Sequence, residues 1–158
     1  VEDKNGGINL DIKYGHAIYP DAAQSRKELV SVAIDDISRQ KSILVVDDHP
    51  QIFRILQARL VKVGYHVGAA VNGKEALALM ESEKPDLVIL DIMMPGMSGY
   101  EVFGRMKEDP DMASIPIIIL TAKNVDTVRE EAPQVGQVPV MTKTGSFNAL
   151  VDLINIMV

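Results

Sequence analysis

Two observations on residues 42–158 predict an α/β protein built on a doubly wound parallel sheet. Uninterrupted apolar runs recur along this segment, and such runs are typical of parallel strands that are buried on both faces. Segments with the 3.6-residue periodicity of amphipathic helices separate the runs. This alternation is the pattern of a sheet covered by helices on both sides. The runs are residues 43–46, 87–90, 115–120 and 138–142, and a further strand is expected at 65–71.

Residues that favour helix starts and stops bound the segments between these strands. Pro50 opens the first helix and Gly64 ends it, while Asn72 can cap the second helix and Pro85 breaks the chain after it. Pro133 would remove a hydrogen bond late in the fourth helix, so that helix is expected to be short. The expected helices are residues 50–63, 74–83, 100–107, 124–132 and 147–157.

Residues 1–41 form a separate segment, which is either an amino-terminal extension or the remnant of a preceding domain. Apolar and polar residues alternate over 8–14, as in a half-buried strand, and a capping box at 25–28 opens a helix to about residue 40. One strand and one helix bury too little surface to fold alone. The unpaired strand is also an open edge, so strand exchange between two copies would give a homodimer.

The composition narrows the class of protein. The chain has 158 residues, a formal net charge of −6, no Cys and no apolar stretch long enough to cross a bilayer. The negative charge and the absence of a basic stripe with interleaved aromatic residues argue against direct nucleic-acid binding. We expect a soluble protein of the cytoplasm that binds no membrane, and the lack of Cys fits a reducing compartment.

Polar residues close four of the predicted strands. Asp47 and Asp48 follow the first run, Asp91 follows the second, and Thr121 and Lys143 end the others. The carboxyl ends of parallel strands meet at one edge of a sheet, so these groups are expected to converge. A cluster of carboxylates without Cys favours Mg²⁺. With a hydroxyl and an ammonium beside them, these groups suit phosphoryl transfer onto a carboxylate, and Asp91 is the candidate nucleophile.

Residues 42–158 resemble the receiver domain of two-component response regulators. The resemblance covers the whole segment and rests on Asp47-Asp48, the stretch 91–99, Thr121-Ala122 and Lys143, which follow the family's order and spacing. It implies a flavodoxin-like sheet of five strands in the order 2-1-3-4-5. Taken singly, each residue also has a structural explanation; Asp48, for example, could cap the helix that follows it.

The resemblance implies a metal site. In the family the second acid of the pair binds Mg²⁺ directly and the first acts through water, which assigns these roles to Asp48 and Asp47. Asp91 and the backbone carbonyl of Met93 would be the other ligands, and Mn²⁺ would substitute for Mg²⁺. No histidine receives a metal or catalytic role, because His49 has no second His or Cys at ligand spacing.

The resemblance also implies a phosphorylation switch rather than a metabolic enzyme. Asp91 would be the phosphoacceptor, with Thr121 and Lys143 contacting the phosphoryl group. A histidine kinase or phosphotransfer protein would supply that group, and an output partner would read the modified state. Two departures affect the output surface: Val140 replaces the usual aromatic residue, and Thr144 replaces the usual Pro and puts the expected cis peptide in doubt.

Three alternatives to a phosphorylation switch can be named, and the residues count against one of them. A degenerate receiver would serve only as a platform for protein interaction or dimerisation. A phosphatase of the haloacid dehalogenase type would need a second Asp two residues beyond Asp91, where Met93 stands. The third alternative is a regulatory module of a diguanylate cyclase, because part of residues 1–41 resembles the end of a GGDEF domain, without its nucleotide-binding signature. The resemblance rests on Gly15-His16-Ala17-Ile18-Tyr19-Pro20-Asp21, Glu28-Leu29 and residues 33–37.

Overall fold

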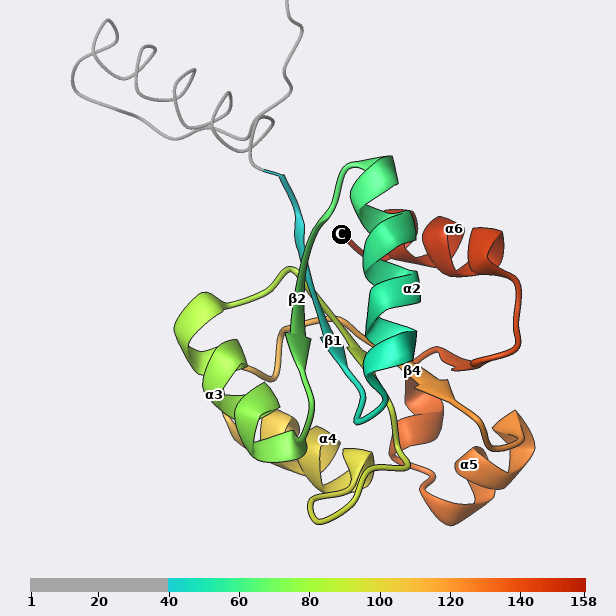
Figure 1. Cartoon of the computed structure of the whole chain (residues 1–158). Coiled ribbons are helices and arrows are strands. Elements are labelled where there is room, and N and C mark those ends of the chain that lie inside the picture. Colours follow the sequence, from blue (N-terminus) through green and yellow to red (C-terminus); the bar gives the residue numbers. More distant parts are fainter. Residues whose placement is uncertain (1–39) are drawn as a thin grey trace, which may run out of the picture. The chain divides into compact units, whose positions relative to one another are not determined.

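The computed structural model describes residues 40–158, which form a five-stranded parallel sheet with helices on both faces (Figure 1). The strand order is β2-β1-β3-β4-β5 and every neighbouring pair is parallel, as the sequence predicts. No helix in this part of the chain is long and apolar enough to cross a membrane. The strands are β1 (Ser42–Val46), β2 (His66–Ala70), β3 (Leu87–Leu90), β4 (Ile117–Thr121) and β5 (Val140–Thr142).

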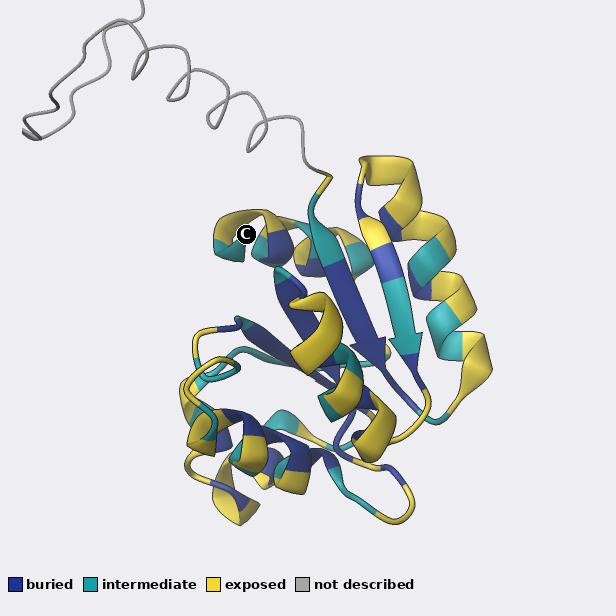
Figure 2. Ribbon diagram, turned by 90° about the vertical axis from the view of Figure 1, so that its left-hand side faces the viewer, coloured by how far each residue is buried: buried dark blue, intermediate teal, exposed yellow. Residues whose placement is uncertain are grey.

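The helices divide between the two faces of the sheet and enclose two hydrophobic clusters. Buried residues of α3, α4 and α5 pack with one face of the sheet, and those of α2 and α6 pack with the other. Figure 2 shows the result as buried strands between helices whose outer sides are exposed. The helices are α2 (Pro50–Leu60), α3 (Gly73–Glu83), α4 (Gly99–Glu108), α5 (Val125–Glu131) and α6 (Phe147–Met157).

Local signals in the sequence set most helix ends. Asn72 and Ser146 accept hydrogen bonds from backbone N–H groups of α3 and α6, and Ser98 forms a capping box with Glu101 on α4. The first helix ends at Leu60 rather than at residue 63, because the last predicted turn is the 3₁₀ helix η1 (Val61–Val63). Gly64 then stops it in the left-handed region, with φ of 101°.

The segment between β4 and α6 is the least regular part of the fold. Helix α5 is as short as Pro133 predicts, and the 3₁₀ helix η2 (Val135–Gln137) follows it. Strand β5 begins at Val140, two residues later than the apolar run suggests. Among residues 40–158 no peptide bond is cis, which includes the bond before Thr144.

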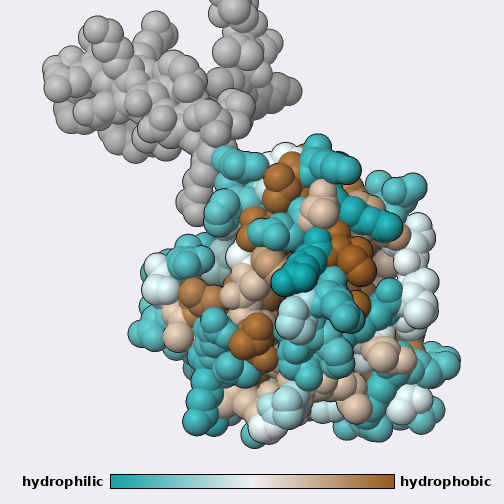
Figure 3. Space-filling model, in the orientation of Figure 1, coloured by the Kyte–Doolittle hydropathy of each residue, from teal (hydrophilic) through white to brown (hydrophobic). Residues whose placement is uncertain are grey.

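On the face of residues 40–158 seen in Figure 3, hydrophilic side chains interrupt the hydrophobic ones. Isolated apolar side chains at a surface are ordinary, so they do not by themselves mark an interface. The most exposed large hydrophobic residues of this unit are Ile55, Val61, Val63, Val71, Met93 and Ile156.

The strand over 8–14 and the helix that a capping box opens at 25–28 lie outside the described residues. The division of the chain near residue 41, the strand exchange and the likeness to a GGDEF domain therefore stay predictions.

Candidate functional site

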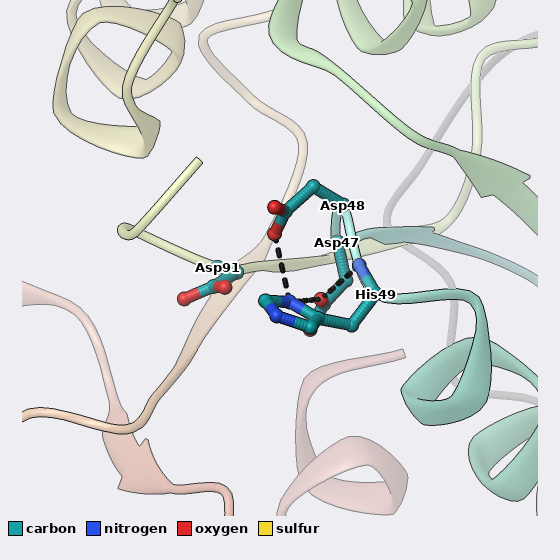
Figure 4. Close-up of side chains that lie close together, drawn as sticks. All are labelled: Asp47, Asp48, His49 and Asp91. Atoms are coloured by element: carbon teal, nitrogen blue, oxygen red, sulfur yellow. Dashed lines mark hydrogen bonds and ion pairs between the residues drawn. The ribbon is translucent and has the colours of Figure 1, made fainter. Parts of the chain in front are cut away.

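The fold brings the polar residues from the ends of β1, β3, β4 and β5 to one edge of the sheet. Backbone hydrogen bonds hold the two most buried acids in place: Asp47 N–H donates to the Ala70 carbonyl at 3.1 Å, and Asp91 N–H donates to the Val46 carbonyl at 2.9 Å. Figure 4 shows the side chains of Asp47, Asp48 and Asp91 close together beside the ring of His49. The predicted convergence of the carboxylates is therefore present.

Lys143 joins two of these carboxylates. Its Nζ lies 2.6 Å from Asp47 Oδ2 and 2.6 Å from Asp91 Oδ2, and all three side chains are largely buried. Burial alone would lower the pKa of Lys143, but its hydrogen bonds to the two carboxylates and their charges outweigh burial and raise that pKa. The ammonium group therefore stays charged and faces the oxygens of Asp91.

Asp91 is 1% exposed, and its surroundings shift the pKa of its carboxyl group in opposite directions. Burial raises the pKa of its carboxyl group, and this outweighs the hydrogen bonds from Lys143 and from the Met93 backbone, which lower it. The Met93 N–H donates to Asp91 Oδ1 at 3.1 Å, while half of the Met93 side chain is exposed. One carboxylate oxygen therefore faces Lys143 and the other faces the backbone of the following loop.

Thr121 is completely buried at the end of β4. Its Oγ1 accepts a hydrogen bond from the Lys123 N–H at 3.1 Å, and its carbonyl accepts one from the Lys143 N–H at 2.8 Å. Thr121 therefore links the end of β4 to Lys143 through a backbone hydrogen bond. Its hydroxyl group is already engaged by the loop that leads into α5.

Asp48 does not cap α2. The N-cap position belongs to His49, whose side chain makes no capping hydrogen bond. The Oδ1 atom of Asp48 is buried and lacks a hydrogen-bond partner, although His49 Nδ1 lies 2.9 Å away as an ion-pair contact. Because His49 holds the N-cap position, the structural explanation of Asp48 as a helix cap is wrong. A buried acceptor without a donor is costly, so Asp48 Oδ1 needs another partner.

Ligand atoms from Asp47, Asp48, His49 and Asp91 all lie within 4.8 Å of one another. Three of these residues are the carboxylates that the sequence singles out. His49 is the residue that sequence reasoning set aside, because the signal sought was a second His or Cys and the structure instead pairs it with acids. His66 lies at the start of β2, at the other end of the strands from this cluster.

Gly99 is a second residue whose role sequence reasoning missed. A Cβ atom at this position would lie 2.2 Å from the carbonyl oxygen of Asp91 and 2.7 Å from the Cα of Ile92. The first turn of α4 therefore packs directly on the backbone of Asp91. The sequence places Gly99 at the end of the motif stretch 91–99, but it does not reveal this close approach, which only the folded chain creates.

Comparisons with known proteins identify the family. The sequence pattern of the response regulator receiver domain matches residues 43–155. Protein PilH of Pseudomonas aeruginosa is 37% identical over 113 residues, which cover 72% of this chain and 93% of PilH. Response regulator PleD of Caulobacter vibrioides is 44% identical over 80 residues, which cover 51% of this chain but 18% of PleD.

The match to the probable transcriptional regulator ycf27 of Guillardia theta likewise covers 33% of that protein, at 47% identity over 55% of this chain. Two solved structures are similar over their full length. Response regulator TrrA of Thermotoga maritima, in complex with Mg²⁺-BeF, is 36% identical with a TM-score of 0.67 and covers 75% of this chain. Chemotaxis protein CheY4 of Vibrio cholerae is 27% identical with a TM-score of 0.69 and covers 76%. This chain therefore belongs to the response regulator receiver domain family.

Proposed function

We propose that Asp91 is the phosphoacceptor of this receiver domain and that phosphorylation switches an output partner. The observation that carries the proposal is the position of Lys143, whose Nζ lies 2.6 Å from Asp91 Oδ2 and 2.6 Å from Asp47 Oδ2. An ammonium group at this place neutralises phosphoryl oxygens as they approach the carboxylate. The degenerate platform, the alternative, does not require such an arrangement.

The donor set fits a hard divalent cation. Asp48 Oδ1 is a buried oxygen without a hydrogen-bond partner, which a metal ion would satisfy, and Asp47 and Asp91 supply further oxygens within reach. We assign Asp48, Asp91 and the Met93 carbonyl as direct ligands of Mg²⁺, or of Mn²⁺ in its place, and Asp47 as a ligand through water. Bound Mg²⁺ would supply charge neutralisation of the phosphoryl oxygens. The structure of TrrA in complex with Mg²⁺-BeF supports a magnesium site in this receiver by similarity.

The protein groups then have distinct tasks in the transfer. An oxygen of Asp91 attacks the phosphorus atom, the bond from phosphorus to the donor's leaving atom breaks, and a mixed anhydride forms on Asp91. Lys143 Nζ moves its hydrogen bond from the carboxylate to a phosphoryl oxygen. The Thr121 hydroxyl group, which accepts from Lys123 N–H, can donate to another phosphoryl oxygen. Water later cleaves the anhydride and returns free Asp91.

The wider setting is also a proposal. A histidine kinase or phosphotransfer protein would donate the phosphoryl group in the cytoplasm, and residues 1–41 would be a separate segment ahead of the receiver. The chain spans 33% of ycf27 and 18% of PleD, so receivers of this kind occur within longer proteins. Regulation of a cyclase by this receiver remains the alternative for the parent protein.

Intact-mass spectrometry after incubation with acetyl phosphate tests the proposal. We expect the chain to gain one phosphoryl group when Mg²⁺ is present and none when Mg²⁺ is chelated. Asp91→Asn should abolish the gain, because its amide is a poor nucleophile. Asp111→Asn, an exposed position outside the site, is the matched control and should behave as the unaltered chain.

If neither acetyl phosphate nor a histidine kinase adds a phosphoryl group in the presence of Mg²⁺, the phosphoacceptor proposal fails. The platform function would then be favoured. A gain that persists in Asp91→Asn would contradict the choice of nucleophile.

A further inference from the structure

We propose that His49 is a nitrogen ligand of the divalent ion at the acidic site, so that this receiver binds late first-row ions such as Ni²⁺ better than an all-oxygen site would. This inference depends on the proposed function in one respect, which is that it uses the same metal position. It assigns a role to a residue that neither the sequence motif nor the proposed magnesium ligands include.

The placement of the imidazole ring carries the first step. His49 Nδ1 lies 2.9 Å from Asp48 Oδ1 and 3.3 Å from Asp47 Oδ1, and the ring lies beside these carboxylates (Figure 4). Ligands about 2.1 Å from a metal in octahedral geometry are neighbours at about 3 Å. The distance between His49 Nδ1 and Asp48 Oδ1 therefore matches one edge of such an octahedron.

The hydrogen bonding carries the second step. His49 Nδ1 shares a hydrogen bond with Asp47 Oδ1 at 3.3 Å, whereas Asp48 Oδ1, which lies 2.9 Å from the same nitrogen, is buried and has no hydrogen-bond partner. A cation bound by the deprotonated Nδ1 would replace the hydrogen bond to Asp47 and would supply the partner that Asp48 Oδ1 lacks. The atom of Asp91 that completes the group lies within 4.8 Å of the others.

The chemistry of the imidazole ligand decides which ions it would bind more tightly. Imidazole suits Ni²⁺, Zn²⁺ and Cu²⁺, whereas Mg²⁺ prefers oxygen ligands and keeps several waters. The His49 side chain is 62% exposed, so its ring can turn into solvent and leave its coordination position to water. Loss of the ring should therefore weaken Ni²⁺ binding strongly and Mg²⁺ binding little.

Calorimetric titration of the whole chain with Ni²⁺ and, separately, with Mg²⁺ at mildly alkaline pH is the first measurement. We expect His49→Ala to weaken Ni²⁺ binding about tenfold or more, by comparison with losses at supporting residues of metal sites, and to leave Mg²⁺ binding within about twofold. His66→Ala is the matched control, since this exposed histidine lies at the opposite edge of the sheet, and it should change neither affinity.

Pulsed electron paramagnetic resonance with bound Cu²⁺, a paramagnetic ion that imidazole suits, gives a second, direct readout. Coupling to an imidazole nitrogen is expected in the unaltered chain and in His66→Ala, and its loss is expected in His49→Ala. Equal Ni²⁺ affinities in the unaltered chain and His49→Ala, or the absence of nitrogen coupling, would overturn the inference. Mg²⁺-dependent phosphorylation that persists in His49→Ala would show that the proposed function stands in that case.

Discussion

The contact between Gly99 and Asp91 predicts the effect of a single methyl group. In Gly99→Ala the new Cβ would meet the Asp91 carbonyl and the Ile92 Cα, which are backbone atoms and cannot turn away. Overpacking of this kind costs roughly 1–3 kcal/mol of unfolding free energy, and it would displace Asp91 itself. We therefore expect urea denaturation to show lower stability and intact-mass spectrometry to show slower phosphorylation.

Gly104→Ala provides the control for Gly99→Ala within the same helix. A Cβ at Gly104 would meet nothing within 4 Å, so the usual preference for Ala over Gly in a helix should raise stability by about 0.5–1 kcal/mol. Equal stabilities for the two variants would contradict the close packing of α4 on Asp91.

The charged and polar residues of the site were the most predictable part of it. Asp47, Asp91, Thr121 and Lys143 each follow an apolar run, and parallel strands bring such positions together by geometry alone. The orientation of His49 was not predictable. It depends on how a side chain turns at the start of α2, and the spacing of residues along the chain carries no such information.

The alternation of strands and helices was predictable because the buried runs and the caps agree on where each element lies. The capping serines and Asn72 set the starts of α3, α4 and α6. Strand β5 was overestimated, because an apolar run does not tell which of its residues pair: Val140 pairs with Ile119, whereas the preceding residues lead out of η2. Tertiary pairing decided this boundary rather than composition.

Helices α4 and α5 are joined by a polar contact that the sequence did not reveal. Tyr100 Oη donates to Glu131 Oε2 at 3.0 Å, and Lys123 Nζ lies 2.5 Å from the same oxygen. Lys123 also bonds Thr121 through its backbone, so this contact borders the site. Burial, followed by the hydrogen bond and charge of Glu131, raises the pKa of Tyr100 to about 12.

This shift predicts a pH dependence of stability. The folded-state pKa of Tyr100 exceeds the ordinary value of 10.0, so its contribution is complete below about pH 10 and is lost as the pH rises through about 12. Tyr100→Phe should cost less than about 1 kcal/mol at neutral pH, since the contact is partly exposed. Urea denaturation at several pH values should show the gap between the two chains closing between about pH 10 and 12, and a constant gap would contradict the contact.

For the molecule as a whole, residues 40–158 contain both hydrophobic clusters and every strand of the sheet. A unit of this size with its own core is large enough to fold alone. The Lys41 carbonyl accepts a hydrogen bond from His66 N–H at 2.9 Å, so a shortened chain should begin no later than Gln40. The start of the first apolar run predicts a boundary in the same place.

We expect a chain of residues 40–158 to unfold cooperatively within a few degrees of the full chain and to take up a phosphoryl group from acetyl phosphate as readily. Calorimetry and intact-mass spectrometry measure these two properties, and a markedly lower unfolding temperature would show that residues 1–39 pack on the receiver.

Sedimentation equilibrium of the full and the shortened chain tests the predicted strand exchange. A dimer of the full chain that becomes a monomer on shortening would support exchange of the strand predicted over residues 8–14, because the receiver keeps all its own strands; a dimer that persists would place the contact on the receiver surface instead.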